Sequence, residues 1–535
     1  MASTPPAAPV AHNGLTSLPP LPPEDRLCLL LARGRLSADD EQQARELLAQ
    51  PLNWDALLDR ARVHEIVPML YHHLARLVAI DLPAPGGPLS SVAAVTPLEP
   101  AASVGLPGDA ATVAPAAVPA AVMSQLEEAY RISRLRTALL AEELARLLLL
   151  LNEDGVPVIP LKGVPLAQAL YGDAALRYSI DIDLLIPASD AVRARRLLLS
   201  HGFESTVPEA FFLAHQFPSC AECTLMRSSL QAGTPATIPA RAARNTAGGD
   251  ARGTQNASLK AGATSRSGFP VDLRWGLLPY WRGDAAAIRD LWDDSRDAEA
   301  VGDFWDELRD ADSSPGRDLR DQSRGAQVVR DLRHDLGDES RNASLSGVQA
   351  RRLSPEWEFL YLALHAASHG WQMLKSLADI HQIATTQALD WAKVREKARR
   401  FGLESAVEQT LTACALLLGT PPPPGFAPGD APQPLSAGAS PQPLPATFVL
   451  RPLPAGVRLF PATPTSGGSW AATRLQLFPL ERRSGRLRML AAFLFVPSPA
   501  EYEWLPLPAW LGFLYYPLRP LRLAFKWTAT LLAGM

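Results

Sequence analysis

Cysteine is scarce in this chain of 535 residues, which holds only four of them. Thiols that are so few and so scattered exclude the disulfide framework of a small secreted protein. Cys220 and Cys223 form a C-x-x-C pair, but a structural zinc site needs two more ligands than such a pair supplies. We therefore interpret the pair as incidental and expect no zinc there.

A secretory signal and a long apolar run are also missing. Residues 1–23 are rich in proline, alanine and serine, and they have neither a basic start nor an apolar core. The uncharged stretch from Trp504 to Leu518 holds three prolines and is shorter than the ~20 residues that a spanning helix requires. We therefore expect a cytoplasmic protein with a disordered N-terminus.

The chain also lacks an excess of positive charge. Its formal net charge is −4 and its pI is about 6.2. Proteins that bind long nucleic acids usually carry a basic face that attracts phosphates. The charge balance therefore argues against a nucleic acid partner.

Proline, by contrast, is abundant, and its 50 residues gather in segments that cannot form a core. A chain of this length exceeds one ordinary hydrophobic core, so several folded units are expected. Disorder or linkers are predicted at 1–23, 79–121, 310–350 and 420–470, with a disordered insertion at 228–268. Folded parts are predicted at 24–78 (helical), 122–309 (mixed), 351–419 (helical) and 471–535 (apolar C-terminal segment).

The motif Asp181-Ile182-Asp183, followed by an apolar run, is the centre of the mixed part. Residues i and i+2 of a strand share one face, so the two carboxylates would project side by side. Adjacent carboxylates repel each other unless a cation lies between them, and Mg²⁺ suits such a pair when phosphates complete its shell. On this reasoning Asp183→Asn would relieve repulsion. The alternative is a strand end with two solvated aspartates.

A phosphate-binding turn is predicted just before this motif. Val156 to Leu161 indicates a buried strand, Lys162-Gly163 a turn, and Pro165 the first turn of a helix. Free backbone N–H groups at such a helix start can bind phosphate, and Lys162 and Arg177 add positive charge. A basic amphipathic helix is predicted from Asp190 to Leu199.

The pattern LKG…Y…R…DIDLLI, followed by a helix and HGF, resembles the uncharacterised bacterial nucleotidyltransferase-like family of the DNA-polymerase-β-type nucleotidyltransferase superfamily. The resemblance implies an α+β fold, with a small mixed sheet flanked by helices and a third carboxylate on a neighbouring strand. That carboxylate would be Asp272, in FPVDLRWGL. One departure concerns the turn: most of the superfamily has Gly-Ser or Gly-Gly there, whereas this chain has Lys162-Gly163-Val164.

The function expected from this resemblance is nucleotidyl transfer that depends on Mg²⁺ (or Mn²⁺). Asp181 and Asp183 would hold one or two ions, and Asp272 would bind the second ion and help to deprotonate an acceptor hydroxyl. Lys162, Gly163 and Arg177 would support the phosphates of a nucleoside triphosphate, while the acceptor, a small molecule or a protein, stays open. The alternative is a protein of the same fold that binds nucleotide or regulates a partner without turnover.

A second informative stretch, PEWEFLYLALHAASHGWQML, indicates a buried helix from Pro355. His365 and His369 lie at i and i+4 and are neighbours on one face. They lack the glutamate of a zinc-protease motif. Either they pack against a neighbouring helix, or His369 and Lys375 face the active cleft, with Asp379 placed to orient His369.

The C-terminal segment mixes apolar residues with Arg519, Arg522 and Lys526. This composition is typical of an interfacial segment that contacts an anionic membrane surface. The alternative is docking of the same residues on the helical domain, which the prolines favour because they interrupt a long amphipathic helix.

Overall fold

The computed structural model describes residues 21–78, 118–227, 269–278, 285–299, 349–424, 426–427, 448–449, 459–461 and 483–533. The predicted insertion at 228–268 lies outside these residues. The predicted disordered or linking segments 1–23, 79–121, 310–350 and 420–470 lie largely outside them.

A five-stranded mixed sheet carries the acidic residues, in the order β1-β2-β5-β4-β3. Strands β2 and β5 are parallel, and the other neighbours are antiparallel. The strands are β1 (Ile159–Pro160), β2 (Ile182–Leu185), β3 (Phe203–Glu204), β4 (Glu222–Arg227) and β5 (Pro270–Arg274). The expected fold class, a small mixed sheet flanked by helices, is confirmed.

The two faces of the sheet pack against different clusters of apolar residues. Ile182 and Leu184 of β2 belong to the cluster that contains the C-terminal half of α5 (Ala120–Glu153) and α7 (Ala191–Ser200). Leu185 belongs to the cluster of the helical region. Because side chains alternate along a strand, Asp183 shares the face of Leu185 and is directed toward the helical region.

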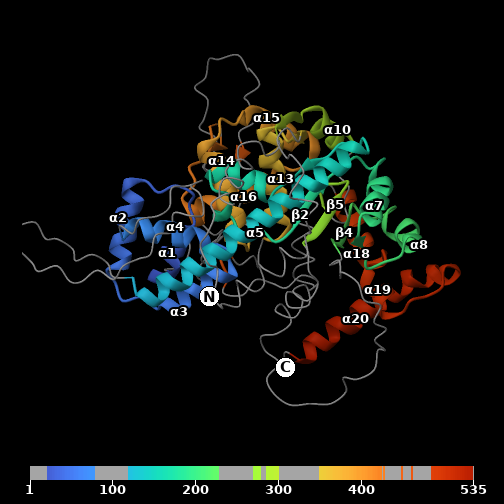
Figure 1. The fold of residues 1–535 in the computed structure, drawn as a ribbon, viewed down its shortest axis with the longest axis horizontal. Coiled ribbons are helices and arrows are strands. Elements are labelled where there is room, and N and C mark those ends of the chain that lie inside the picture. The colour runs from blue at the N-terminus through green and yellow to red at the C-terminus, as the bar shows by residue number, and fades with distance from the viewer. Residues whose placement is uncertain are drawn as a thin grey trace, which may run out of the picture.

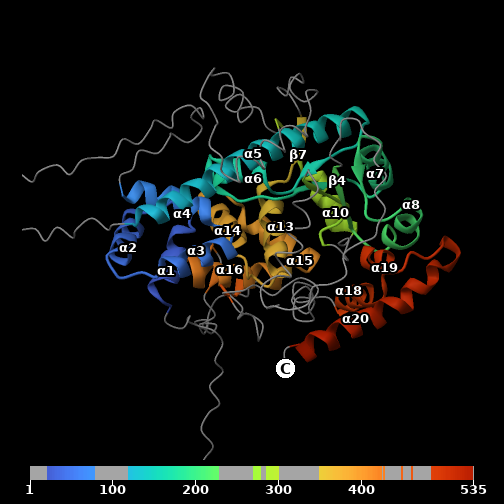
Figure 2. The same cartoon turned by 60° about the horizontal axis from the view of Figure 1, so that its bottom comes forward.

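Helix α5 connects the two ends of the molecule. Its N-terminal half packs beside α4 (Val67–Leu77), and its C-terminal half runs over the sheet toward α7 (Figures 1 and 2). Leucines recur at helical spacing over residues 123–152 of the sequence, and this stretch lies within α5. The helices predicted with Pro165 in the first turn and after Asp190 are confirmed, and they are α6 (Val164–Tyr171) and α7.

One large apolar cluster contains residues both of the helices before residue 78 and of the helices after Pro355. They are α1 (Pro23–Leu31), α2 (Ala38–Leu48), α3 (Trp54–Val63), α4, α13 (Pro355–Ser368), α14 (Leu374–Thr386), α15 (Trp391–Phe401) and α16 (Glu404–Leu418). The shorter helical elements are η2 (Ala174–Leu176), α8 (Glu209–Phe211), the π-helical η3 (Phe212–Gln216) and α10 (Ala285–Asp293). Two further strand pairs are β6 (Arg296–Glu299) with β7 (Gln349–Arg352) and β8 (Phe426–Ala427) with β9 (Phe448–Val449). The helix predicted from Pro355 is therefore confirmed and forms part of a core.

The C-terminal segment forms α18 (Arg483–Phe495), α19 (Pro499–Trp504), η5 (Ala509–Leu514) and α20 (Tyr515–Ala533). In both views α19 lies beside α8 and α20 runs from there toward the C-terminus (Figures 1 and 2). Tyr515 is buried and packs edge-on against Phe211 of α8, with ring centroids 5.1 Å apart. Met489 joins the helical cluster. The expectation of docking on the helical domain is therefore wrong for most of the segment, because its aromatic residues find their partners on the sheet domain.

No helix within the described residues is both long and apolar enough to cross a membrane.

Candidate metal and nucleotide site

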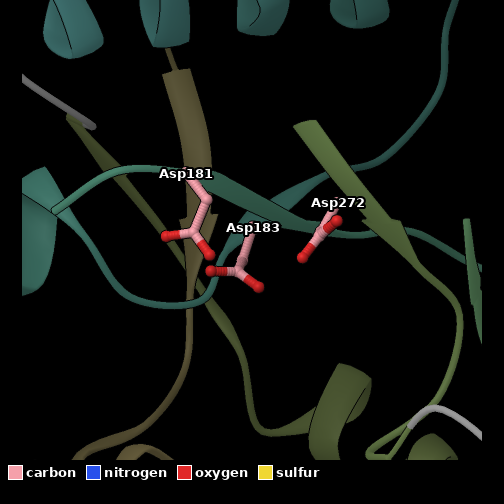
Figure 3. Close-up of side chains that lie close together, drawn as sticks. All are labelled: Asp181, Asp183 and Asp272. Atoms are coloured by element: carbon pink, nitrogen blue, oxygen red, sulfur yellow. The ribbon is translucent and has the colours of Figure 1, made fainter. Parts of the chain in front are cut away.

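Three carboxylates meet on one face of the sheet, where β2 and β5 run side by side. Ligand oxygens of Asp181, Asp183 and Asp272 all lie within 4.8 Å of one another. Figure 3 shows the carboxylates gathered together, with Asp183 between the other two. The three acids of the predicted metal site are therefore close enough to share one cation.

Strand register explains this arrangement. Asp183 is the direct partner of Asp272 in the parallel pair, so their side chains leave the sheet on the same face. Across the antiparallel pair, Thr224 stands opposite Asp272 and Glu222 stands opposite Arg274. The hydroxyl of Thr224 donates a hydrogen bond of 2.6 Å to Oδ1 of Asp272, which fixes that carboxylate. The polar face therefore extends from β2 across β5 to β4.

Two cations of the chain itself lie among these acids. Nζ of Lys162 is 2.8 Å from Oδ2 of Asp183 and 3.6 Å from Oδ2 of Asp181. Nε of Arg274 donates to Oδ1 of Asp183 at 2.9 Å, and its Nη2 lies 3.5 Å from Oδ2 of Asp272. The third guanidinium nitrogen, Nη1, is 2.6 Å from Oε2 of Glu222. Asp183 is thus ion-paired through both oxygens.

The pKa shifts follow from this arrangement. Burial would raise the pKa of Asp183, but Lys162 and Arg274 lower it below its ordinary value. Burial would likewise lower the pKa of Lys162, but Asp183 and Asp181 raise it. Asp272 lacks so close a cation, so burial and the charge of Asp183 raise its pKa. Asp183 is therefore held ionised in the protein.

A divalent cation fits this set of ligands. Three carboxylates and two cations leave one net negative charge, and an ionised Glu222 makes it two. The side chains of Asp181 and Asp272 are 27% and 19% exposed, so an ion can reach them from solvent. Oxygen ligands of this kind suit Mg²⁺ and Mn²⁺. Asp181, Asp183 and Asp272 would hold the ion.

The predicted phosphate turn lies immediately beside the acids. Gly163 caps the N-terminus of α6 with φ of 78° and ψ of −134°, a conformation that only glycine adopts without strain. The backbone N–H groups of the first turn of α6 have no partners within the helix. Lys162 and Gly163 thus bring a cation and a helix start next to the carboxylates.

Among the described residues, Arg177 pairs with Asp379 and forms no ion pair with the three acids, although the charge of Asp181 helps to raise its pKa. Its Nε donates to Oδ2 of Asp379 at 2.8 Å, and its Nη1 donates to Ser179 at 3.0 Å. The hydroxyl of Tyr171 donates to the other oxygen of Asp379. The spacing in the sequence had indicated that Asp379 could orient His369, but its carboxylate is bound to Tyr171 and Arg177. Instead it ties the segment before Asp181 to α14, and the phosphate role of Arg177 stays a prediction.

A row of polar rings on α13 borders the site. The rings of Tyr361 and His365 stack with centroids 6.1 Å apart, and those of His365 and His369 lie 4.7 Å apart. The Tyr361 hydroxyl is buried and has no hydrogen-bond partner among the residues that the structure describes. Burial, reinforced by the charges of Lys162 and Arg274, lowers the pKa of His369 to about 4. The rings on this side of the site are thus close enough to Lys162 and Arg274 for these charges to shift the pKa of His369.

Of the two residues predicted on this side of the cleft, His369 packs edge-on against His365, and Lys375 is held by an ion pair and a hydrogen bond. Nζ of Lys375 contacts Glu65 and donates to the backbone oxygen of Tyr178 at 3.0 Å. Their roles toward a ligand stay predictions.

Sequence reasoning missed Arg274 and Glu222. Arg274 stands two residues after Asp272, so the alternation that selected Asp272 could also have placed Arg274 on the same face. Glu222 lies between Cys220 and Cys223, and its place in the site depends on strand pairing with Arg274, which no local pattern in the sequence specifies. Both thiols are buried, and they belong to no metal-ligand group within the described residues.

Comparison with known proteins agrees with this site. A family model described as an uncharacterised nucleotidyltransferase matches residues 50–312 and 321–419. The matched residues include the sheet, its three acids and α13 to α16. No curated protein and no solved structure matches the chain. Since the family model covers more than half of the sequence, the chain belongs to the uncharacterised nucleotidyltransferase family.

Proposed function

We propose that the protein is a metal-dependent nucleotidyltransferase of the DNA-polymerase-β type. It would move a nucleoside monophosphate from a nucleoside triphosphate to an acceptor hydroxyl. The observation that carries the proposal is the group of three carboxylates, Asp181, Asp183 and Asp272, beside the Gly163 turn. Family membership supports a transferase, and the acids support a divalent metal, for which we propose Mg²⁺.

Each part of the site has a role in this proposal. The metal, when bound, would neutralise phosphate charge and stabilise the oxygens that attack and leave. Lys162 would move from Asp183 to a phosphate oxygen, since the metal would take over the neutralisation of the acid. The backbone N–H groups of α6 after Gly163 would bind another phosphate oxygen. Arg177, tied to Asp379, would position the segment that leads to Asp181.

Binding of Mg²⁺–nucleotide tests the proposal directly. Equilibrium dialysis with each of the four ribonucleoside triphosphates should show binding that requires Mg²⁺ or Mn²⁺. The double variant Asp181→Asn/Asp272→Asn should lose this dependence on metal. The control Asp190→Asn, which changes an acid at the start of α7 outside the group of three, should bind as the wild type does.

The alternative function gives a different result. A protein that only binds nucleotide or regulates a partner would bind Mg²⁺–nucleotide without any release of pyrophosphate, even with an excess of hydroxyl acceptors. Absence of metal-dependent nucleotide binding to the wild type would contradict both functions. A cytoplasmic location belongs to the proposal and is tested by fractionation of cells.

A further inference from the structure

A pocket of about 210 Å³ opens at the far edge of the sheet, on the other side of the acids from the phosphate turn. Its lining comes from β4, from the end of β3 and the residues that follow it, from Gln216 of η3, and from Ser498 and Pro499 of the C-terminal segment. It was not foreseen from the sequence, because its walls come from segments that are far apart in the chain.

Two residues of β4 connect this pocket with the acidic site. Thr224 and Glu222 both line the pocket. Thr224 also donates a hydrogen bond to Asp272, and Glu222 forms an ion pair with Arg274. The sheet order β1-β2-β5-β4-β3 therefore places three regions in a row: the Gly163 turn after β1, the acids on β2 and β5, and the pocket at β4 and β3. In nucleotidyl transfer the attacking and leaving oxygens lie on opposite sides of the phosphorus. The three regions follow the same order, with the Gly163 turn on the side of the leaving oxygen and the pocket on the side of the attacking oxygen.

The lining residues define what the pocket can hold. Ser205, Thr206, Gln216, Thr224 and Ser498 offer hydroxyl and amide groups, and Glu204 and Glu222 offer carboxylates. Lysine, arginine and histidine are absent from the residues that line it. Among the residues that line the pocket, an anionic ligand would meet carboxylates but no cation, since Arg274 lies behind Glu222 and is already paired with it, whereas hydroxyl or ammonium groups would find acceptors.

We propose that this pocket binds the acceptor, an uncharged or positively charged small molecule with a free hydroxyl, and that Glu222 receives the hydroxyl proton. The inference rests on the proposed function. The acceptor oxygen forms a bond to the α-phosphorus, and the bond from that phosphorus to the oxygen bridging to the β-phosphate breaks. Pyrophosphate leaves with the electron pair, and the proton passes to the Glu222 carboxylate.

The environment of Glu222 suits this role. Burial raises the pKa of Glu222 to about 7, although Arg274 opposes the shift. A carboxylate whose pKa lies near neutral pH is an effective general base. The ion pair with Arg274 also fixes the Glu222 carboxylate, and the same Arg274 lies 2.9 Å from Asp183 and 3.5 Å from Asp272.

Three probe acceptors of similar size test the charge preference: glycerol, the aminotriol Tris and glycerol 3-phosphate. Each is mixed at equal concentration with the full-length protein, Mg²⁺ and an α-³²P-labelled nucleoside triphosphate that binds in dialysis. We expect transfer to glycerol and Tris at rates at least tenfold above the rate with glycerol 3-phosphate. Thr206→Lys, which adds a cation to the pocket, should raise the rate with glycerol 3-phosphate at least tenfold. Ser189→Lys adds the same charge at the start of α7, outside the pocket, and should change nothing.

Glu222→Gln tests the proton acceptor. We expect kcat with glycerol to fall by about 100-fold, the lower end for a lost general base, with Mg²⁺–nucleotide affinity within twofold of the wild type. A purely structural role for Glu222 would lower the affinity and the melting temperature as well. Ser205→Lys repeats the charge test if Thr206→Lys fails to fold.

The outcomes separate this inference from the proposed function. Equal or faster transfer to glycerol 3-phosphate by the wild type, or an unchanged preference in both lysine variants, overturns the acceptor pocket. So does a protein that binds Mg²⁺–nucleotide and transfers to none of the three probes. Failure to bind Mg²⁺–nucleotide at all overturns the proposed function instead.

Discussion

Asp183 is the residue on which the charge balance of the site depends. Its side chain is 1% exposed and pairs with both Lys162 and Arg274. The sequence indicated two repelling carboxylates, from which Asp183→Asn was expected to relieve strain. The structure reverses that expectation, because the substitution would leave two buried cations with less compensation.

We predict that Asp183→Asn lowers the free energy of unfolding by about 3 kcal/mol, the size expected when one partner of a buried ion pair is lost. Asp181→Asn is the matched control. Its side chain is 27% exposed and its nearest cation is 3.6 Å away, so its loss should cost less than about 1 kcal/mol. Urea denaturation without metal measures both, and equal losses in the two variants would contradict the assignment of the charge balance to Asp183.

Glu222 gives the stability a dependence on pH. Its pKa is about 7 in the folded protein and 4.5 ordinarily, so the folded state holds its proton more tightly. Between about pH 4.5 and 7 the folded state therefore binds more protons than the unfolded state, and stability falls as pH rises. We predict that the loss of stability between pH 5 and pH 8 is smaller in Glu222→Gln by about 1–3 kcal/mol.

Urea denaturation at the two pH values measures this difference. The control is Glu503→Gln, at an exposed glutamate of α19. A Glu222→Gln variant with the same pH dependence as the wild type would show that Glu222 is not the titrating group.

At the scale of elements, helices could be predicted from the sequence and the sheet edges could not. The stripe of leucines before Asn152 and the Lys162-Gly163-Val164-Pro165 turn are local signals, and α5 and α6 follow them. Strands β1 and β3 have two residues each and exist only through pairing with distant neighbours. Glu222 was missed for the same reason, because its place is set by pairing with Arg274.

The C-terminal helices are tied together by one buried acid. Glu501 of α19 has no exposed surface and contacts Arg519 and Arg522 of α20. Its carboxylate also accepts hydrogen bonds from Ser498, which supports the pocket wall. Neutralising Glu501 would remove the carboxylate charge that Arg519 and Arg522 both contact.

We predict that Glu501→Gln loosens these helices while the rest of the protein stays folded. The cost should be about 3–5 kcal/mol for the contact between α19 and α20. Limited proteolysis should then cut near residues 496–515 at least tenfold faster than in the wild type, and Glu503→Gln should not change the rate. Unchanged cleavage would show that apolar packing of Tyr515 alone holds the segment.

At the scale of the whole molecule, several large apolar side chains of the C-terminal segment face solvent. Trp510 is 75% exposed, Phe513 62%, Leu521 66% and Phe525 77%. Arg522 and Lys526 lie among them, and the sequence has no acidic residue after Glu503. Docking on the sheet domain thus explains the burial of Tyr515 but leaves these four apolar side chains exposed. The peripheral membrane contact stays a prediction.

We predict that the protein sediments with vesicles that contain anionic phosphatidylglycerol and is released by high salt. Apolar burial would supply part of the affinity, and each cation near the surface about 1 kcal/mol. Trp510→Ala/Phe513→Ala should weaken binding at least tenfold, whereas Leu213→Ala, at an apolar residue of η3 that is 37% exposed, should not. Self-association in sedimentation velocity without any vesicle binding would identify a second copy of the chain as the partner.

The position of Ser498 and Pro499 in the chain has a consequence for the order of events during synthesis. The ribosome makes the sheet and its acids long before these residues, which form the far wall of the pocket. With the proposed assignments, a nascent chain gains its nucleotide site first and its acceptor site only after the C-terminal segment has docked. Transfer to the proper acceptor would then have to wait until Ser498 and Pro499 have been synthesised and have packed against the sheet domain.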